Sequence, residues 1–178
     1  GIGVTDHNST ANVEAVIEAA QGEVVVFGGM ELMTQEEIHL LVFFGNIEQL
    51  HLFQQFVDKH IGGLNDPDRF GEQYLVDREG YVTGTSEKLL SGALDLSIEE
   101  AVDMTHEYGG IAIAAHIDRE SYSIVSQLGF IPESLALDAV EIMNSAATGY
   151  ITGRPLTEIA SSDAHTPEQI GSSVSAIQ

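Results

Sequence analysis

The residues of this chain that could carry out chemistry are histidines and acids that follow short apolar runs. Four runs each end at such a group, and the groups are Asp6 with His7, Glu31, His116, and Asp163 with His165. A short continuous apolar run is typical of a strand that is buried on both faces. Because the carboxyl ends of parallel strands meet at one edge of a sheet or barrel, we expect these side chains to converge there.

A further histidine, His39, lies near the beginning of an apolar run at 38–44 instead of at its end. If that strand returns antiparallel from Glu31 through the link at 32–37, its first residues lie at the same edge as the other groups. We therefore include His39 in the candidate site.

Several ionisable side chains in one cleft would repel one another or lose solvation unless cations neutralised them. Imidazole and carboxylate ligands suit zinc, manganese and iron, and the absence of cysteine excludes thiolate ligands and disulfides. We therefore predict metal ligands at His7, Glu31, His39, His116, Asp163 and His165.

Such a centre favours hydrolysis of a phosphate ester. A carboxylate such as Glu31 can bridge two ions, and ions roughly 3.5–4 Å apart generate hydroxide and stabilise the attacking and leaving oxygens. The expected nucleophile is then a metal-bound hydroxide, and no side chain need act as one. Arg119, close behind His116, is our candidate for binding the phosphate, since the chain has only 6 lysines and arginines and a guanidinium presents a matching fork. Arg154 is a weaker candidate, because it can simply belong to a loop.

The elements that must position these groups alternate between apolar strands and helices. This alternation predicts an α/β protein, and a closed or nearly closed parallel barrel rather than an open sheet. With 178 residues, of which 43% are hydrophobic, we expect one core and a single domain spanning 1–178. The irregular, glycine-containing stretch at about 64–93 is expected to be an insertion or a lid.

Acidic residues dominate the composition, with 28 acids against 6 bases and a formal net charge of −22. Such a surface repels a phosphate backbone, so we expect a nucleic-acid polymer to be a poor partner. A small phosphorylated substrate remains compatible, because bound cations reverse the potential locally. No apolar run reaches the roughly 18 residues of a membrane helix, and the absence of cysteine fits a cytoplasmic location. The oligomeric state stays open.

Other polar residues have simpler interpretations. Three histidines within predicted helices are expected to be surface or capping residues, and they are His51, His60 and His106. Asp6 adjoins His7 on one strand, so it points to the opposite face and either orients a neighbour or caps the following turn. Glu141 and Asn144 end a strand at the expected edge, although Asn144 could equally cap a turn. Gly28–Gly29 lacks the lysine of a phosphate loop and indicates close backbone packing.

The same groups also resemble, in their order, the motifs of the polymerase-and-histidinol-phosphatase (PHP) superfamily. The segments concerned are Gly3–Asn8, Gly29–Glu31 followed by Ile38–Leu41, Ala115–His116 with Arg119, and Ser162–His165. One such motif is weak, whereas four in order are specific, and the resemblance covers essentially the whole chain. The stretch from Phe70 to Pro132 is most similar to small stand-alone members, which are metal-dependent phosphoesterases.

The resemblance implies a distorted (β/α)7 barrel, similar to a TIM barrel, with up to three divalent ions (zinc, manganese or iron). In that pattern one ion is held with the help of His7 and His165, a second by Asp163 and the bridging Glu31, and a third by Glu31, His39 and His116. The family's first strand, with its His-X-His motif, has no counterpart in the chain and would precede residue 1. Without that motif at least one ion would lose most of its ligands.

The function that the resemblance implies is hydrolysis of a small phosphomonoester or cyclic phosphodiester, such as a nucleotide or sugar phosphate. Two alternatives stay open. A non-catalytic metal-binding or regulatory module is favoured if the first motif is truly missing. A nuclease or polymerase-associated proofreading domain is the other, against which the acidic charge and the lack of a basic, aromatic-lined groove argue.

Overall fold

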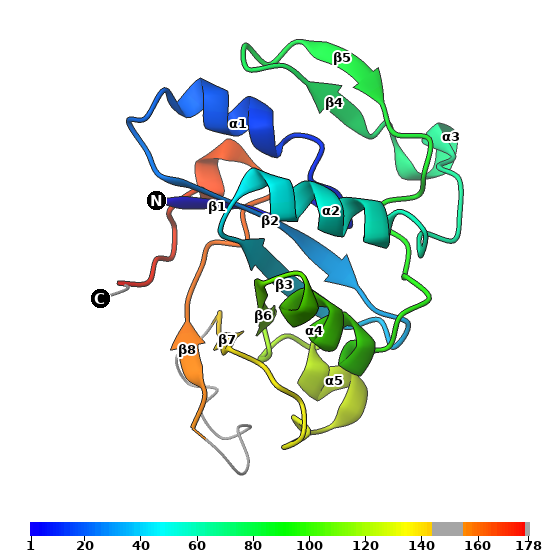
Figure 1. Cartoon of the computed structure of the whole chain (residues 1–178), viewed down its shortest axis with the longest axis vertical. Helices are drawn as coiled ribbons and strands as arrows, with labels where there is room; N and C mark the ends of the chain where they lie inside the picture. The colour runs from blue at the N-terminus through cyan, green and yellow to red at the C-terminus, as the bar shows by residue number, and fades with distance from the viewer. Residues whose placement is uncertain (144–154, 177–178) are drawn as a thin grey trace.

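The computed structural model of the chain describes residues 1–143 and 155–176 (Figure 1). The strands are β1 (Ile2–Val4), β2 (Val26–Met33), β3 (His39–Phe44), β4 (Tyr74–Val76), β5 (Val82–Thr85), β6 (Gly110–Ala114), β7 (Ala139–Glu141) and β8 (Thr157–Ile159). The helices are α1 (Val13–Ala20), α2 (Ile47–Val57), α3 (Pro67–Phe70), α4 (Ile98–Glu107), α5 (Ile124–Leu128) and the 3-10 helix η1 (Pro167–Gln169).

The main sheet is mixed and has six strands in the order β1-β2-β3-β6-β7-β8. β3 is antiparallel to its neighbours β2 and β6, whereas the pairs β1/β2, β6/β7 and β7/β8 are parallel. The start of β3 therefore lies at the same edge as the carboxyl ends of the other strands. We call this edge the carboxyl edge. Because β3 runs antiparallel to β2, its first residue, His39, lies at this edge, as the sequence predicts.

The expected distorted (β/α)7 barrel is wrong for this chain. The described residues form a six-stranded mixed sheet that curves into a half-barrel, with β1 and β8 at the two ends of the strand order. A TIM-like barrel needs a helix after each parallel strand and a continuous ring of paired strands. Here β2 turns directly into β3 with no helix between them, so that pair is antiparallel. Apolar periodicity marks where strands lie but not their direction or whether a ring closes.

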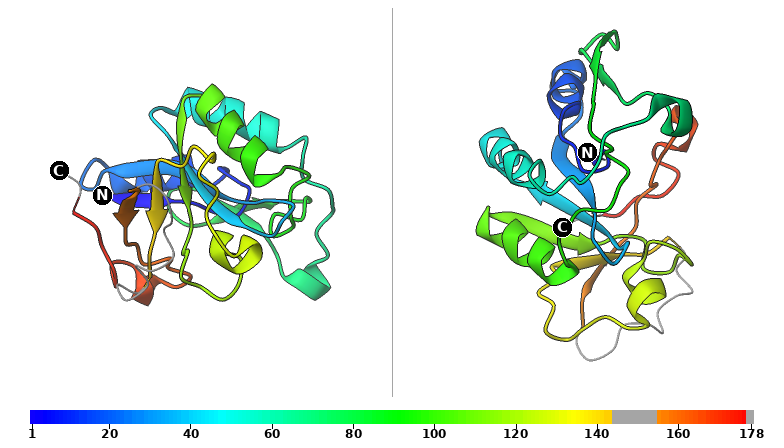
Figure 2. Two further views of the ribbon diagram at one scale, coloured as in Figure 1. Left: turned by 90° about the horizontal axis from the view of Figure 1, so that it is seen from below. Right: turned by 90° about the vertical axis from the view of Figure 1, so that its right-hand side faces the viewer.

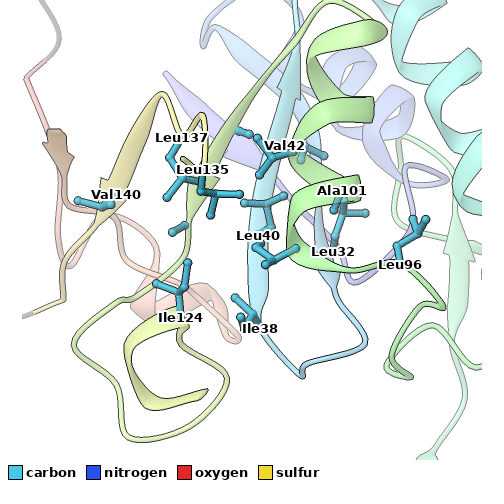
Figure 3. Packing of buried hydrophobic residues seen from close by; sticks show 14 of the residues in the cluster. Leu32, Ile38, Leu40, Val42, Leu96, Ala101, Ile124, Leu135, Leu137 and Val140 are labelled. Carbon is cyan, nitrogen blue, oxygen red and sulfur yellow. The ribbon is translucent and has the colours of Figure 1, made fainter. Parts of the chain in front are cut away.

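Helices α1, α2 and α4 cover one face of this sheet (Figure 2, right). The buried hydrophobic core on that face includes Leu32 and Leu40 from the sheet and Ala101 from α4 (Figure 3). Because side chains alternate along a strand, Glu31 points to the opposite face. The opposite face carries a smaller buried cluster made of Leu41, Ile113, Ala115 and Ala139.

The longer helices begin at the caps that their sequences predict. The Ser97 hydroxyl accepts the Glu100 backbone N–H at 3.2 Å, and the Glu100 carboxylate accepts the Ser97 N–H at 2.9 Å, which completes a capping box at α4. The Asn46 side chain accepts the Gln49 N–H at 2.9 Å at the start of α2. Among the helices of the described ranges, none is long and apolar enough to cross a membrane.

Two adjacent glycines, Gly28 and Gly29, lie within β2, which continues to Met33. A Cβ atom added at Gly29 would lie 2.2 Å from the Val42 carbonyl oxygen, and one at Gly28 would lie 2.9 Å from the Val13 side chain. Close backbone packing is therefore confirmed, since these glycines allow β3 and α1 to approach β2.

The irregular stretch at 64–93 contains α3 and the β4–β5 hairpin. Hydrogen bonds connect this stretch to the loop after His7. Asn8 Nδ2 donates to the carbonyl oxygens of Leu90 and Gly92, each at 2.8 Å. The side chain of Asn12 likewise binds the backbone of β4. Whether this stretch acts as an insertion or as a lid stays a prediction.

Candidate metal centre

Glu31 is the centre of a polar cluster at the carboxyl edge. The residues that follow β1 remain paired with β2 next to Glu31. The Asn8 N–H donates to the Glu31 carbonyl at 2.9 Å, and the Glu31 N–H donates to the Asp6 carbonyl at 3.1 Å. This pairing leaves His7 Nδ1 3.1 Å from Glu31 Oε2. A histidine after β1 and a glutamate in β2 thus share one site.

Two more histidines surround the same carboxylate. His39 is the first residue of β3, and its Nδ1 lies 3.3 Å from Glu31 Oε1. His116 follows β6, and its Nε2 lies 3.5 Å from Glu31 Oε1 and 3.2 Å from His39 Nδ1. Glu31, His39 and His116 are buried, whereas His7 is half-buried. The structure therefore gathers His7, Glu31, His39 and His116 into one group, which we call the Glu31 cluster.

The electrostatics of this cluster favour a carboxylate anion beside a neutral imidazole. Burial tends to raise the pKa of Glu31, but hydrogen bonds from His116 and His39 and the charges of His39 and His7 outweigh it, so the pKa lies well below its usual range. Burial lowers the pKa of His7, although the charge of Glu31 opposes the shift. Deprotonated carboxylate and imidazole are the forms that coordinate metal.

The residues of the cluster fit a divalent cation. Ligand atoms roughly 2.1 Å from a tetrahedral ion lie roughly 3.4 Å from one another, and the nitrogen-to-oxygen distances around Glu31 are 3.1, 3.3 and 3.5 Å. Ligand atoms of His7, Glu31 and His39 all lie within 4.8 Å of one another. Within the described residues, the buried Nδ1 atoms of His7 and His116 make no hydrogen bond. The 3.1 Å contact of His7 Nδ1 with Glu31 Oε2 is not aligned as a hydrogen bond. A bound ion is one way to satisfy such atoms.

Asp163, His165 and Arg119 form a second group at the same edge. Arg119 Nη2 lies 2.5 Å from Asp163 Oδ2, and His165 Nδ1 lies 4.0 Å from Asp163 Oδ1. The Asp163 side chain is 18% exposed, whereas those of Arg119 and His165 are 41% and 65% exposed. The charges of His165 and Asp163 contribute to the pKa of His7, so this group lies near the Glu31 cluster without being part of it.

Four residues of this region have a left-handed backbone. The φ angles are 48° at Asn8, 30° at His116, 57° at Tyr122 and 41° at Asp163. A left-handed backbone conformation costs a non-glycine residue about 1–3 kcal/mol. Such a conformation persists only where the surrounding structure holds it, most often at functional sites. The strain therefore coincides with the candidate centre.

Two further residues contact the Glu31 cluster, namely Tyr122 and Glu141. The Tyr122 ring stacks on the His39 ring with centroids 4.9 Å apart and planes inclined by 10°. Glu141 is buried and accepts the His116 N–H at 2.9 Å. Tyr122 carries no recognisable signal in the sequence, whereas Glu141 is recognised there as an acid at a strand end but without a role.

The remaining polar residues of the sequence analysis lie away from the Glu31 cluster or outside the described ranges. Asp6 is exposed, and its Oδ2 accepts the Asn12 side-chain amide at 3.1 Å. Asn144 and Arg154 lie outside the described residues. Three histidines pair with carboxylates away from the Glu31 cluster: His51 with Glu14 at 3.0 Å, His60 with Asp95 at 2.6 Å and His106 with Asp138 at 2.8 Å.

Comparisons with known proteins gave a family model and a solved structure to which the chain is similar. A family model described as PHP-associated matches residues 141–178. Among solved structures, the chain is similar to a novel lesion-specific endonuclease from Pyrococcus furiosus, with a TM-score of 0.57 and 16% sequence identity. The match covers 95% of this chain and 41% of that chain, so this chain spans less than half of the endonuclease. No curated protein matches the chain in a sequence comparison.

The structural match corrects one expectation. The acidic charge led us to expect that a nucleic-acid polymer is a poor partner, but the matched structure, which has the same fold over most of this chain, is an endonuclease. Net charge averages over the whole surface, whereas binding of a phosphate backbone depends on the local potential, which bound cations can reverse. The formal charge of −22 therefore does not exclude such a partner.

Two observations relate the sequence to PHP proteins. Motifs typical of one superfamily occur in order from Gly3 to His165, and a family model of PHP-associated segments matches the C-terminal part of the chain. The C-terminal part of the chain is therefore similar to PHP-associated segments, in agreement with the superfamily that its motifs resemble.

Proposed function

We propose that this chain is a phosphoesterase that depends on divalent ions bound at the Glu31 cluster. The observation that carries the proposal is the carboxylate of Glu31, which three imidazole nitrogens approach to between 3.1 and 3.5 Å. The match of residues 141–178 to a PHP-associated family model supports a metal-dependent hydrolase. Divalent ions in such a site supply Lewis acidity and lower the pKa of water.

We assign different side chains as ligands on the two sides of Glu31. Glu31 has two oxygens directed at different histidines, Oε2 towards His7 and Oε1 towards His39 and His116, which suits a bridging carboxylate. In our proposal His39 and His116 complete the ligands on the Oε1 side. His7 completes those on the Oε2 side, together with the nearby Asp163 and His165, whose charges act on His7.

Arg119 is our candidate for holding the phosphate of the substrate. Its side chain is 41% exposed, and its guanidinium contacts Asp163, so Arg119 lies at the edge of the proposed centre and remains open to solvent. A guanidinium can bind two phosphate oxygens at once. Its contact with Asp163 would hold it in place before a substrate arrives.

Small phosphate esters are the first substrate class that we propose, namely phosphomonoesters or cyclic phosphodiesters such as nucleotides and sugar phosphates. With a net charge of −22, the surface offers little attraction to an anion beyond the proposed ions and Arg119. A small ester needs only these local contacts. The positive charge that would bind such an ester comes from the proposed ions and Arg119.

Cleavage of a nucleic-acid phosphodiester is a second candidate. The fold similarity to a lesion-specific endonuclease favours it. The proposed chemistry is the same, since both substrate classes are phosphate esters, whose hydrolysis divalent ions would assist. The two candidates differ in the contacts that the rest of the surface must make.

The experiment is a hydrolysis assay of the purified chain after removal of metal and reconstitution with manganese, zinc or iron. The substrates are nucleoside monophosphates, sugar phosphates, cyclic nucleotides, and DNA duplexes with and without a base lesion. We expect metal-stimulated hydrolysis that Glu31→Gln and His39→Asn abolish, whereas the matched controls Glu48→Gln and His51→Asn, both on the exposed side of α2, retain it. Metal binding without hydrolysis of any of these substrates would instead support the non-catalytic module.

A further inference from the structure

Glu141 is a buried acid that lies outside the Glu31 cluster. It is the last residue of β7 and is 1% exposed. Among the described residues, no lysine or arginine forms an ion pair with it. Burying a carboxylate without a cation is costly unless hydrogen bonds satisfy both of its oxygens. The partners of Glu141 therefore indicate what it does.

Each oxygen of Glu141 binds a donor on a different neighbouring strand end. Oε2 accepts the backbone N–H of His116, just beyond β6, at 2.9 Å. Oε1 accepts the hydroxyl of Ser161, just beyond β8. Because β7 lies between β6 and β8, one carboxylate connects both of its neighbours at the carboxyl edge (Figure 1).

Both connections lead to proposed ligands with a strained backbone. His116 itself receives the first, at φ 30°. The second reaches Asp163 through Ser161, whose oxygen accepts the Asp163 N–H at 3.4 Å, and Asp163 has φ 41°. Backbone strain of this kind persists only where hydrogen bonds or packing hold it.

We infer that Glu141 is a positioning residue that holds His116 and Asp163 in the orientation needed for binding the ions, an inference that rests on the proposed function. It acts through hydrogen bonds of defined length and not through its charge. Residues that orient metal ligands in this way typically change metal affinity by about 10- to 100-fold when they are replaced.

Two conservative substitutions separate hydrogen-bond geometry from charge. Glu141→Gln keeps the length of the side chain: its amide oxygen can accept the His116 N–H, and its amide nitrogen can donate to the Ser161 oxygen, which also accepts. Glu141→Asp keeps the charge but is shorter by one methylene, so it cannot reach both donors. The geometric role predicts that the aspartate variant is the more defective of the two.

The test measures manganese affinity by calorimetry and the absorption spectrum of the cobalt-substituted chain for both variants. Glu158→Gln and Glu158→Asp, at an exposed acid on the adjacent β8, serve as matched controls. We expect Glu141→Asp to bind manganese about 10- to 100-fold more weakly and to alter the cobalt spectrum. Glu141→Gln should stay within roughly threefold of the wild type, because its hydrogen bonds are retained. The Glu158 variants should match the wild type.

Hydrogen exchange of the His116 amide, followed by NMR in the metal-free chain, provides a readout that does not depend on ions. We expect faster exchange in Glu141→Asp and little change in Glu141→Gln. The inference is overturned if Glu141→Asp leaves metal affinity and His116 exchange unchanged, or if Glu141→Gln is the more defective variant. A wild-type chain that binds no metal contradicts the proposed function instead, and the exchange data then still decide whether Glu141 holds His116.

Discussion

The rings of His39 and Tyr122 are stacked almost in parallel, with centroids 4.9 Å apart and an angle of 10° between their planes. The contact is reinforced by the backbone, since the His39 N–H donates to the Tyr122 carbonyl at 2.8 Å. Tyr122 has a left-handed backbone with φ 57° and is 42% exposed. An aromatic ring from the loop before α5 thus restricts the orientation of a proposed ligand.

Removing the Tyr122 ring should weaken metal binding at His39. An aromatic pair contributes about 0.5–1.5 kcal/mol beyond its buried area, so we expect Tyr122→Ala to weaken manganese binding by roughly 2- to 12-fold. Tyr122→Phe keeps the ring and should bind as the wild type does. Calorimetric titration measures the affinity, with Tyr81→Ala in the hairpin as a remote control. Equal affinities of Tyr122→Ala and wild type would show that stacking does not orient His39.

Divalent ions should stabilise the folded chain through Glu31. A ligand at 100 times its Kd stabilises the native state by about 2.7 kcal/mol, which for a domain of this size raises Tm by roughly 5–10 °C. Thermal unfolding with and without zinc or manganese measures this effect. Glu31→Gln should lose it because the central carboxylate is gone, whereas Glu48→Gln should retain it. An equal rise of Tm in Glu31→Gln would place the stabilising ion elsewhere.

The capping box of α4 should make stability depend on pH. Hydrogen bonds from the Ser97 backbone and hydroxyl lower the pKa of Glu100 below its usual range. A depressed pKa in the folded state stabilises the chain above the unfolded pKa, about 4.3, and this contribution is lost as the pH falls through the folded value. The stability difference between wild type and Glu100→Gln should therefore be present at pH 7 and shrink towards pH 3.5.

Denaturant unfolding at several pH values checks this prediction, with Glu99→Gln as the control in the same helical turn. Glu99 is also an acid of the first turn of α4 but is not part of the capping box. A difference between wild type and Glu100→Gln that stays constant from pH 7 to pH 3.5 would contradict the assignment to the capping carboxylate.

A methyl group at Gly29 should separate β2 from β3. The added Cβ would lie 2.2 Å from the Val42 carbonyl oxygen and 2.7 Å from the Phe43 ring. Overpacking of a buried site costs about 1–3 kcal/mol, so we expect Gly29→Ala to lower the free energy of unfolding by at least that amount in urea. Because Glu31 lies two residues further along β2, metal binding should weaken as well.

Gly62→Ala is the matched control, since nothing lies within 4 Å of a Cβ added there. Its unfolding free energy should change by no more than about 0.5 kcal/mol, as is usual for surface substitutions. If Gly29→Ala is as stable as Gly62→Ala, the close approach of β3 to β2 is not a constraint on the fold.

Much of the candidate site was predictable from local pattern. His7, Glu31 and His116 each follow or end an apolar run, and the parallel strands bring such positions to one edge. The place of His39 followed from one further step, the antiparallel return of β3, which the pairing confirms. Arg119, Asp163 and His165 remain predicted site residues, and the structure places them together at the same edge.

The sequence by itself determined which residues could bind metal and roughly where the strands lie, because residue type and apolar periodicity are local properties. Only the tertiary structure decided that the sheet is a mixed half-barrel, that Tyr122 stacks on His39 and that Glu141 connects β6 with β8. Strand direction, ring closure and contacts between distant side chains depend on how the elements pack against one another. The spacing of apolar residues along a single helix or strand does not predict that packing.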